Sequence, residues 1–550
     1  MHTTDTDGAG GEDISAALDP MQMGAALADL MNPAILAGEA PRLAAELIKV
    51  GLGSSALEIS EDRRFADPAW QENPFYRLIG QSYLAWEQSV GRLVEQQQGS
   101  WPRRERVRYL ANILTGGMSP TNFLLGNPAA LKRAVETQGQ SLARGARNFS
   151  RDVLNNRGMP QMVDSRPLTV GKDLAVSPGA VVYREEMFEL LQYVPTTAAV
   201  RERPLLFVPP EVNKYYVLDL APGRSMVEYA ISQGVHTFML VWRNPRLDKS
   251  LGHGHWGMDD YLAAHLRAFD VVREISGAQD INLVGLCAGG MTSALAQAHL
   301  AAQGANPVRA AAYLVTMLDG RQRNMVGTLA TPQAKSLLAQ EARRGTVIDS
   351  KTLAHSFAWM RPNDLVYSYM VNDWLLGNDA PAFDVLAWND DAANLPAALA
   401  LDSNALLTSG KIIKPNGVSF LGTPIDLSKV TSDIFLVAGL RDHITAWRAC
   451  YMTSQLLGGD TQVVVVDSGH IQSFVNPVGK SRYKYWWGPA GGADPDAWLA
   501  QAEVRDGSWW PLWAEWLLSR SGEEKPSPPA LGSHRYPPGD PAPGRYVHEK

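Results

Sequence analysis

Residues 281–295, INLVGLCAGGMTSAL, place a cysteine where a nucleophile is expected. An apolar run precedes the motif Gly285-x-Cys287-x-Gly289, and a helix-like pattern follows it. Small residues on either side of the central one allow a sharp strand-to-helix turn, which is the nucleophile-elbow arrangement with cysteine in place of the usual serine. The N–H groups at the start of the helix favour a thiolate and can bind a developing oxyanion. The structural alternative is a small buried cysteine at a tight packing point.

Two later segments supply an acid and a base in a suitable order. The apolar run in SDIFLVAGLRDHITAW ends at Asp442 and His443, and the run in QVVVVDSGHIQSFVNP ends at His470. The order nucleophile, acid, histidine is that of α/β-hydrolase folds, and each group follows the carboxyl end of a predicted strand. A thiol needs a base, and the base needs an orienting partner. The sequence therefore predicts a catalytic triad of Cys287, Asp442 and His470.

Other interpretations of these residues stay open. Asp442 could instead cap a helix that begins at Ile444. His443 could replace His470 as the base, although the neighbour of the acid points away from it on most backbones. Cys450, the second of the two cysteines, lies in a helix pattern and is interpreted as a packed thiol. No Cys/His pair has zinc spacing, so no metal site is predicted.

The segment LLFVPPEVNKYYVLDL is interpreted as a strand, a Pro-Pro loop and a helix. In α/β-hydrolase folds the loop after this strand supplies one oxyanion N–H group, and the residue after the nucleophile supplies the other. We therefore expect the backbone N–H groups of Val212, or of its neighbour Glu211, and of Ala288 to form the oxyanion hole. A rigid Pro-Pro turn without a catalytic part is the alternative.

The elements that must position these residues are short buried strands separated by helices. Such strands predict a parallel sheet with helices on both faces. Between Asp319 and Ser432 lies an insertion far longer than the usual ~2–6-residue connection, which predicts a cap subdomain. The predicted strands lie in PLLFVPP, VHTFMLVW, INLVGL, RAAAYLVTML, SDIFLVAGL and TQVVVVDSG.

The chain of 550 residues is too long for a single average domain. Leu43, Leu47 and Val50 recur at helical spacing, and this stripe either packs on its own domain or docks on a hydrophobic partner. The predicted parts are a disordered and then amphipathic segment (1–61), a helix-rich domain (62–195), an α/β catalytic domain (196–319 and 432–520), the cap (320–431) and an extended Pro-rich tail (521–550).

Composition excludes several classes of function. The net charge is −7, and no Lys/Arg-rich run with interleaved aromatic residues is present, so nucleic acid is not an expected partner. The acidic, polar start lacks the features of a secretory signal, and no uncharged apolar stretch reaches the ~18 residues of a membrane span. Two cysteines cannot form a disulfide framework, which suits a reducing cytoplasm.

From about residue 62 onward the chain resembles the polyhydroxyalkanoate synthases, and it is most similar to the class II, single-polypeptide type. The class II leaning comes from GMPQMVD, GHIQS and APGRYVHEK. The resemblance rests on NPFYRLIGQSYL, SPTNFLLGNPAALKRAVETQGQSLARG, PPEVNKYYVLDL, VWRNP, GLCAGG, FAWMRPNDLVYSYMVNDWLLGN, FDVLAWNDDAANLPAA, GTPIDLSKVTSDIFLVAG, DHITAW and SGHIQSFVNPVGKSRY.

The resemblance assigns the nucleophile to Cys287, the acid to Asp442 and the base to His470. The chain departs from the family at Glu211, where Trp or Gln is usual, and at Ala446, where Pro is common. The first departure lies in the predicted oxyanion loop.

The resemblance implies an α/β-hydrolase fold with a large cap insertion and a helical N-terminal domain. It implies polymerisation of (R)-3-hydroxyacyl-CoA with release of CoA and without a metal or redox cofactor. Its implied partners are the growing polyester, a granule surface in the cytoplasm, granule-coat proteins and a second copy of the chain. The competing hypotheses are a cysteine-dependent thioesterase or polyester depolymerase of the same fold, and a non-enzymatic granule-coat protein.

Overall fold

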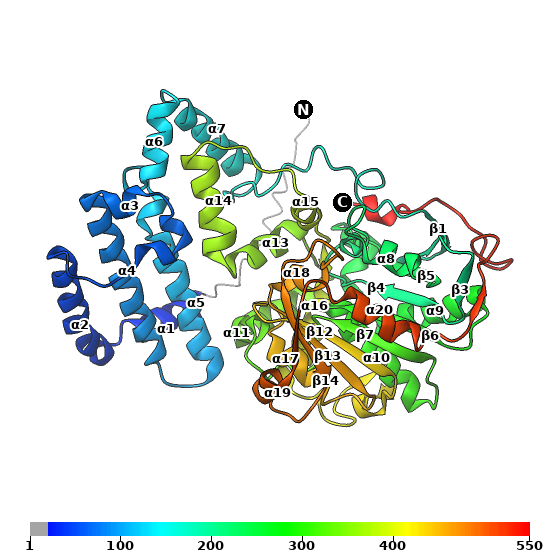
Figure 1. Ribbon diagram of the computed structural model, residues 1–550. Coiled ribbons are helices and arrows are strands. Elements are labelled where there is room, and N and C mark those ends of the chain that lie inside the picture. Colours follow the sequence, from blue (N-terminus) through cyan, green and yellow to red (C-terminus); the bar gives the residue numbers. More distant parts are fainter. Residues whose placement is uncertain (1–19) are drawn as a thin grey trace, which may run out of the picture. The chain divides into compact units, whose positions relative to one another are not determined.

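The computed structural model describes residues 20–550 (Figure 1). The predicted disordered tail, residues 1–18, lies outside the described residues. The described chain divides into two compact units. The first, the helical unit, holds residues up to 160 together with 331–337 and 351–378. The second, the sheet unit, holds residues 161–330, 338–350 and 379–550.

Asn-Pro pairs start three of the helices in the helical unit. Asn32, Asn73 and Asn127 each accept a hydrogen bond from a backbone N–H in the first turn, and the following proline occupies a position where no N–H is needed. The helices are α1 (Pro20–Leu30), α2 (Pro33–Gly51), α3 (Ala69–Glu72), α4 (Pro74–Glu95), α5 (Trp101–Gly117), α6 (Pro128–Glu136) and α7 (Gln140–Asn155).

Helix α2 packs along α4. Val50 is buried there, and the buried carboxylate of Glu39 accepts a hydrogen bond from Arg92 of α4 at 2.9 Å. Leu43 is half-buried and Leu47 is exposed. Of the two interpretations of the apolar stripe, the structure therefore shows packing on its own domain.

All six predicted strands form in the sheet unit, and they run parallel in the order β5-β4-β6-β7-β12-β13. Every residue of β4, β5 and β6 is buried, as expected for strands that are covered on both faces. The strands are β4 (Leu205–Val208), β5 (Thr237–Trp242), β6 (Ile281–Leu286), β7 (Val308–Leu314), β12 (Asp433–Gly439) and β13 (Thr461–Val466).

Four antiparallel strands extend the sheet to ten. The pair β1 (Gly179–Arg184) and β2 (Phe188–Tyr193) adds beyond β5, and the pair β14 (Lys484–Pro489) and β15 (Glu503–Asp506) adds beyond β13. The sheet thus begins at residue 179, whereas the sequence placed 62–195 in a helix-rich domain and began the catalytic domain at 196. Strand β2 has the sequence FELLQY and is buried throughout. Because Glu189 and Gln192 are polar, its sequence is typical of a surface segment and did not predict a buried strand.

Helices cover both faces of the sheet. On β7, Ala312 and Leu314 pack in one core with α8 (Met226–Ser232) and α20 (Trp510–Leu518). The intervening Tyr313 faces α10 (Ala288–Ala302), where Gln297 donates a hydrogen bond to its hydroxyl group at 2.6 Å. Helix α9 (Met258–Ser276) packs beside α10, and α19 (Pro495–Gln501) lies between β14 and β15 in the chain. The prediction of an α/β fold is confirmed.

The predicted cap, residues 320–431, is mostly helical but is not one compact unit. Residues 331–337 and 351–378 belong to the helical unit, and the remainder belongs to the sheet unit. Inside the helical unit, a Cβ atom on Gly145 would lie 1.9 Å from the carbonyl oxygen of Trp374, so only glycine permits this close approach. The elements are α11 (Met325–Leu329), α12 (Pro332–Arg343), β8 (Val347–Ile348), α13 (Ser350–Trp359), α14 (Ser368–Met370) between two π-helical turns, α15 (Asp384–Asp390), β9 (Leu395–Pro396), α16 (Ala397–Ser409), β10 (Ser419–Phe420) and β11 (Thr423–Pro424).

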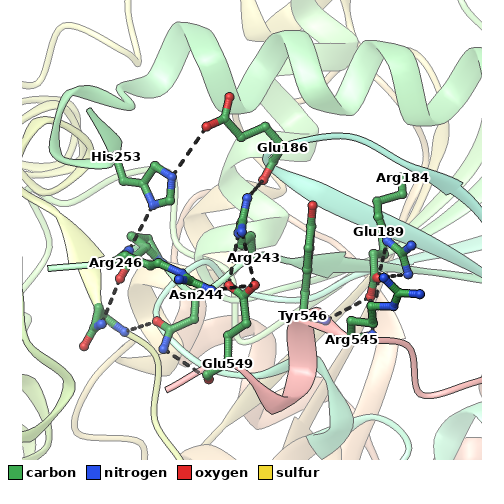
Figure 2. Close-up of polar contacts among 12 residues, drawn as sticks. Arg184, Glu186, Glu189, Arg243, Asn244, Arg246, His253, Arg545, Tyr546 and Glu549 are labelled. Atoms are coloured by element: carbon green, nitrogen blue, oxygen red, sulfur yellow. Dashed lines mark hydrogen bonds and ion pairs between the residues drawn. The ribbon is translucent and has the colours of Figure 1, made fainter. Parts of the chain in front are cut away.

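The Pro-rich segment 521–550 is extended and belongs to the sheet unit. Its β16 (Glu524–Pro526) pairs with β3 (Ala199–Arg201), and the red chain in Figure 1 continues past β1. Figure 2 shows its last residues against the loop after β5. There Glu549 accepts hydrogen bonds from Arg243 at 3.0 Å and Arg246 at 3.4 Å, and the Tyr546 ring packs against the Arg243 guanidinium group.

Among residues 20–550, no helix is long and apolar enough to cross a membrane.

Candidate active site

Cys287 occupies a strained turn between β6 and α10. Its φ of 51° and ψ of −116° lie outside the regions that non-glycine residues prefer. The turn is also crowded, because a Cβ atom on Gly289 would lie 2.4 Å from the carbonyl oxygen of Pro209 and one on Gly290 would lie 2.0 Å from Oγ1 of Thr316. The small residues that the sequence places here are therefore needed to form the turn.

The structure brings the three predicted triad residues together. They follow β6, β12 and β13, three parallel strands whose carboxyl ends lie at one edge of the sheet. Nδ1 of His470, the first residue of α18 (His470–Phe474), lies 2.6 Å from Oδ2 of Asp442. The Cys287 thiol lies near the same imidazole and helps to raise its pKa. The three side chains thus lie at one edge of the sheet, in the order expected of a nucleophile, a base and an orienting carboxylate.

The pair of Asp442 and His470 favours an imidazolium ion. Burial alone would lower the pKa of His470, but the charge of Asp442, the hydrogen bond with Asp442 and the interaction with Cys287 outweigh it and raise that pKa to about 10. Burial would raise the pKa of Asp442, but the charge of His470 and several hydrogen bonds lower it below its usual value.

Asp442 also makes the contacts of a turn cap, through its other oxygen. Its Oδ1 atom accepts hydrogen bonds from the backbone N–H groups of Ile444 at 2.8 Å and Thr445 at 3.1 Å. The alternative of a helix that begins at Ile444 is wrong, because the next helix, α17, begins at Trp447; Asp442 fixes a turn with one oxygen and faces the histidine with the other. That histidine is His470, the residue that the chain order of an α/β-hydrolase fold predicts.

Thr445 is a site residue that the sequence did not reveal. It is buried, and its hydroxyl group donates to Oδ2 of Asp442 at 2.8 Å and lies 3.3 Å from Nδ1 of His470. Its carbonyl oxygen accepts a hydrogen bond from the thiol of Cys450, which stands on α17 (Trp447–Thr453). Cys450 is fully buried, and burial raises its pKa well above the ordinary value, as expected of a packed thiol.

The predicted oxyanion donors lie on two adjacent segments. Val212 follows β4, and Ala288 begins α10, whose first turn packs against the same loop at Pro209. Within residues 20–550, neither the Val212 nor the Ala288 N–H group has a hydrogen-bond acceptor. Both groups are therefore available to an oxygen of a bound substrate.

The loop after β4 is braced from two directions. The buried Lys214 donates hydrogen bonds to Asp391 at 2.9 Å and to the carbonyl oxygen of Val547 at 2.7 Å. The carbonyl oxygen of Lys214 accepts a hydrogen bond from Trp388 of α15 at 2.7 Å. Part of the insertion and the C-terminal segment thus fix the loop that carries Val212.

Two family models match the chain. The model described as the N-terminus of poly-beta-hydroxybutyrate polymerase (PhaC) matches residues 61–230. The model of the α/β-hydrolase fold matches residues 220–477, which include all three triad residues. The second match agrees with the ten-stranded sheet and its helical cover.

Curated relatives match most of the chain. Poly(3-hydroxyalkanoate) polymerase 1 of Ectopseudomonas oleovorans is 42% identical over 92% of this chain and 90% of that protein. Poly(3-hydroxyalkanoate) polymerase 2 of the same organism is 43% identical over 94% of this chain and 92% of that protein. The poly(3-hydroxyalkanoate) polymerase subunit PhaC of Cupriavidus necator is 38% identical over 89% of this chain and 83% of that protein. The chain therefore belongs to the poly(3-hydroxyalkanoate) polymerase family and has the α/β-hydrolase fold that the sequence predicts.

Proposed function

We propose that this chain is an acyltransferase that polymerises (R)-3-hydroxyacyl-CoA into polyhydroxyalkanoate, releases CoA and holds the acyl group as a thioester on Cys287. The observation that carries the proposal is the contact of 2.6 Å between His470 and Asp442 beside the strained turn at Cys287 that begins α10. The identity of the relatives over about nine-tenths of the chain supports the same reaction class.

In the first step, His470 takes the proton of the Cys287 thiol, and the thiolate attacks the acyl carbonyl of the CoA thioester. The oxygen of the tetrahedral intermediate accepts hydrogen bonds from the N–H groups of Ala288 and Val212. The bond to the CoA sulfur breaks, and the CoA thiolate takes the proton from His470. One thioester replaces another, so the acyl group stays activated, whereas transfer to a serine would give a less reactive ester.

In the second step, the hydroxyl group of another acyl unit attacks the thioester on Cys287. His470, oriented by Asp442, takes the proton of that hydroxyl group. An ester bond forms, the bond to the Cys287 sulfur breaks, and the proton returns to that sulfur. These steps use no metal and no redox cofactor. Water must be kept from the thioester, because hydrolysis would waste the activated acyl group.

The product of this reaction is an apolar polyester, so we propose that the protein works at the surface of polymer granules in the cytoplasm. Apolar side chains exposed on the helical unit support such a location, and they include Phe75, Leu78, Met118, Phe123 and Leu125. The resemblance also supports a homodimer and contacts with granule-coat proteins. Light scattering with and without substrate tests the dimer.

Replacement of each cysteine tests the proposed reaction. Cys287→Ser should lose CoA release by orders of magnitude, because a serine hydroxyl has a far higher pKa and forms a less activated ester. Cys450→Ser is the matched control and should retain CoA release. Products should be identified together with free CoA, because free hydroxy acid in place of polymer would reject the polymerase in favour of a thioesterase or depolymerase. Polymer formation by a Cys287→Ala variant would reject covalent catalysis altogether.

A further inference from the structure

A buried hydrogen-bond chain runs behind the nucleophile turn, from the loop after β4 to α9. Oε1 of Glu211 lies 2.9 Å from Oγ1 of Thr292 on α10, and the same Oγ1 atom lies 3.2 Å from Nε2 of His265 on α9. Nδ1 of His265 lies 2.8 Å from the carbonyl oxygen of Tyr261. All four residues are buried, and Glu211 is only 3% exposed.

The direction of each hydrogen bond follows from the acceptor at the far end. The Tyr261 carbonyl oxygen can only accept, so Nδ1 of His265 carries a proton. Burial lowers the pKa of His265 to about 4, so the ring is neutral and its Nε2 atom is an acceptor. Thr292 therefore lies between Glu211 and His265, which can each accept a hydrogen bond from its single hydroxyl proton.

Protonation of Glu211 satisfies every group in this chain. The Thr292 hydroxyl group donates to Oε1 of Glu211 when Glu211 is a carboxylate; a carboxylic acid at Glu211 would donate to Thr292 instead and free the Thr292 proton for His265. A carboxylate at Glu211 would compete with His265 for the Thr292 proton, and one buried acceptor would lose its partner. The carbonyl oxygens of Ala288 and Gly289, at 3.3 and 3.1 Å from the Thr292 oxygen, add further competition for the same proton.

The surroundings hold no charge that would compensate a carboxylate at Glu211. The titratable groups that face it are His265 and Tyr261 on α9, and both are neutral because burial lowers the pKa of the histidine and raises that of the tyrosine. On β5, the Trp242 ring packs on both of them, and α10 contributes the uncharged Thr292. Within residues 20–550, no lysine or arginine forms an ion pair with Glu211. Burial raises the pKa of Glu211 to about 7.

This hydrogen-bond chain joins the two segments that carry the proposed oxyanion donors. Glu211 immediately precedes Val212, and Thr292 lies about one helical turn after Ala288. The loop is held elsewhere as well, because Trp242 donates to the Pro209 carbonyl oxygen at 3.1 Å. A negative charge on Glu211 would also oppose the negative charge that develops on the reacting oxygen.

We propose that Glu211 is a positioning residue that works as a buried carboxylic acid: its proton leaves the Thr292 hydroxyl group free to donate to His265, and loss of that proton breaks the hydrogen-bond chain at His265, places a negative charge beside the oxyanion site and slows acyl transfer. The kinetic consequence of this inference rests on the proposed function. Ionisation of Glu211 would make acyl transfer sensitive to pH, although Glu211 does not touch the substrate.

The kinetic test compares the wild type with Glu211→Gln and Glu211→Leu in CoA release from 3-hydroxyacyl-CoA between pH 6 and 8.5. An amide keeps a neutral donor to Thr292 but does not titrate, so the rate ratio of Glu211→Gln to wild type should rise about tenfold per pH unit above 7. Leucine is neutral but cannot donate, so Glu211→Leu should be slower than Glu211→Gln at every pH. If the ratio of the Glu211→Gln rate to the wild-type rate does not change with pH, the proton of Glu211 has no role in the reaction. Equal rates of the Leu and Gln variants overturn the role of the hydrogen bond.

Thermal unfolding tests the proton without any substrate. A carboxyl group whose pKa is raised by folding destabilises the folded state progressively as pH rises from its unfolded value of 4.5 to its folded value of about 7. The melting temperature of Glu211→Gln relative to wild type should therefore increase across this window and level off above it. If the difference in melting temperature between Glu211→Gln and wild type does not change with pH, Glu211 is not a buried carboxylic acid. If the wild type released no CoA, the proposed function would fail while this measurement would still decide the state of Glu211.

Discussion

Replacement of Asp442 by Asn puts an amide NH₂ group in the place of Oδ2, which reverses the hydrogen bond with His470 and removes the acceptor of the Thr445 hydroxyl group. The amide oxygen of the new side chain can still accept from the N–H groups of Ile444 and Thr445, so the loop keeps its shape. The new amide NH₂ group then faces Nδ1 of His470, where the carboxylate oxygen stood. The imidazole must accept at Nδ1 and carry its proton at Nε2, which is the wrong tautomer for a base.

The magnitude follows from the charge that is lost. The rise of the His470 pKa from 6.5 to about 10 corresponds to roughly 5 kcal/mol in favour of the imidazolium ion, supplied by Asp442 and Cys287 together. The same substitution in a serine triad lowers turnover about 10⁴-fold. We expect chain growth by Asp442→Asn to fall about 10³- to 10⁴-fold. The first acylation should fall less, because the start of α10 already favours a thiolate whereas an alcohol needs the full His–Asp pair.

Rapid-quench measurement of CoA release separates the two steps. Asp442→Asn should release up to one CoA per active site in a burst and then show almost no steady-state turnover. Asp467→Asn is a matched control, because Asp467 lies on the neighbouring loop after β13, is partly exposed and pairs with Arg441. The control should keep both the burst and the turnover. Equal losses of burst and turnover in Asp442→Asn would refute the idea that the two steps depend differently on Asp442.

The same variant has a signature in stability. Folding raises the pKa of His470. The stabilisation of the folded state by the Asp442–His470 ion pair is therefore fully present below pH 6.5 and is lost as pH rises through about 10. Because folding lowers the pKa of Asp442, the stabilisation is also lost as pH falls below its ordinary value of 3.8. The melting temperature of wild type minus that of Asp442→Asn should therefore be larger at pH 6 than at pH 10. An unchanged difference would show that the ion pair does not form.

Three further predictions use the same structure. Gly289→Ala should lose about 1–3 kcal/mol of stability together with most activity, because its Cβ atom would lie 2.4 Å from the Pro209 carbonyl oxygen; normal unfolding and CoA release would contradict the tight turn. Cys450→Ser should lower the free energy of unfolding by about 1–3 kcal/mol, because it buries a more polar group, while CoA release per folded molecule stays near wild type. Deletion of residues 1–61 should lower the melting temperature and the activity on soluble substrate together, since it removes α2, which buries Val50 and Glu39 against α4; if only granule association were lost, the segment would be a docking element.

The triad and the central strands could be predicted because their signals are local. A strand that is buried on both faces must be apolar over its whole length, as in β6 and β13. Ligand-binding groups follow the carboxyl ends of such strands, so Cys287, Asp442 and His470 could be named from their positions alone. The turn glycines gave a local signal as well, because they flank the nucleophile in the sequence, although the atoms that crowd them belong to Pro209 and Thr316, which are distant in the chain.

The features that were missed depend on partners distant in the sequence. Strand β2 buries Glu189 because Arg184 and the backbone N–H groups of Arg545 and Tyr546 satisfy its carboxylate, the latter from about 356 residues away. The division of residues 320–431 between two units likewise depends on close approaches such as that of Gly145 to Trp374. Thr445 gave no signal, because a threonine in a loop is common and only its burial beside Asp442 gives it a role.

The contacts between the C-terminal residues and the loop after β5, shown in Figure 2, can form only late in protein synthesis. Glu549 is 306 residues later in the chain than Arg243, so at about 5–20 residues per second it leaves the ribosome some 15–60 s after its partner. The carbonyl oxygen of Val547 accepts a hydrogen bond from Lys214, and Val547 is 333 residues later in the chain than Lys214. A nascent chain that ends between residues 471 and 545 contains Cys287, Asp442 and His470, but its loops after β4 and β5 still lack these last contacts. The chain therefore contains the three residues of the proposed triad before the last contacts of these two loops can form.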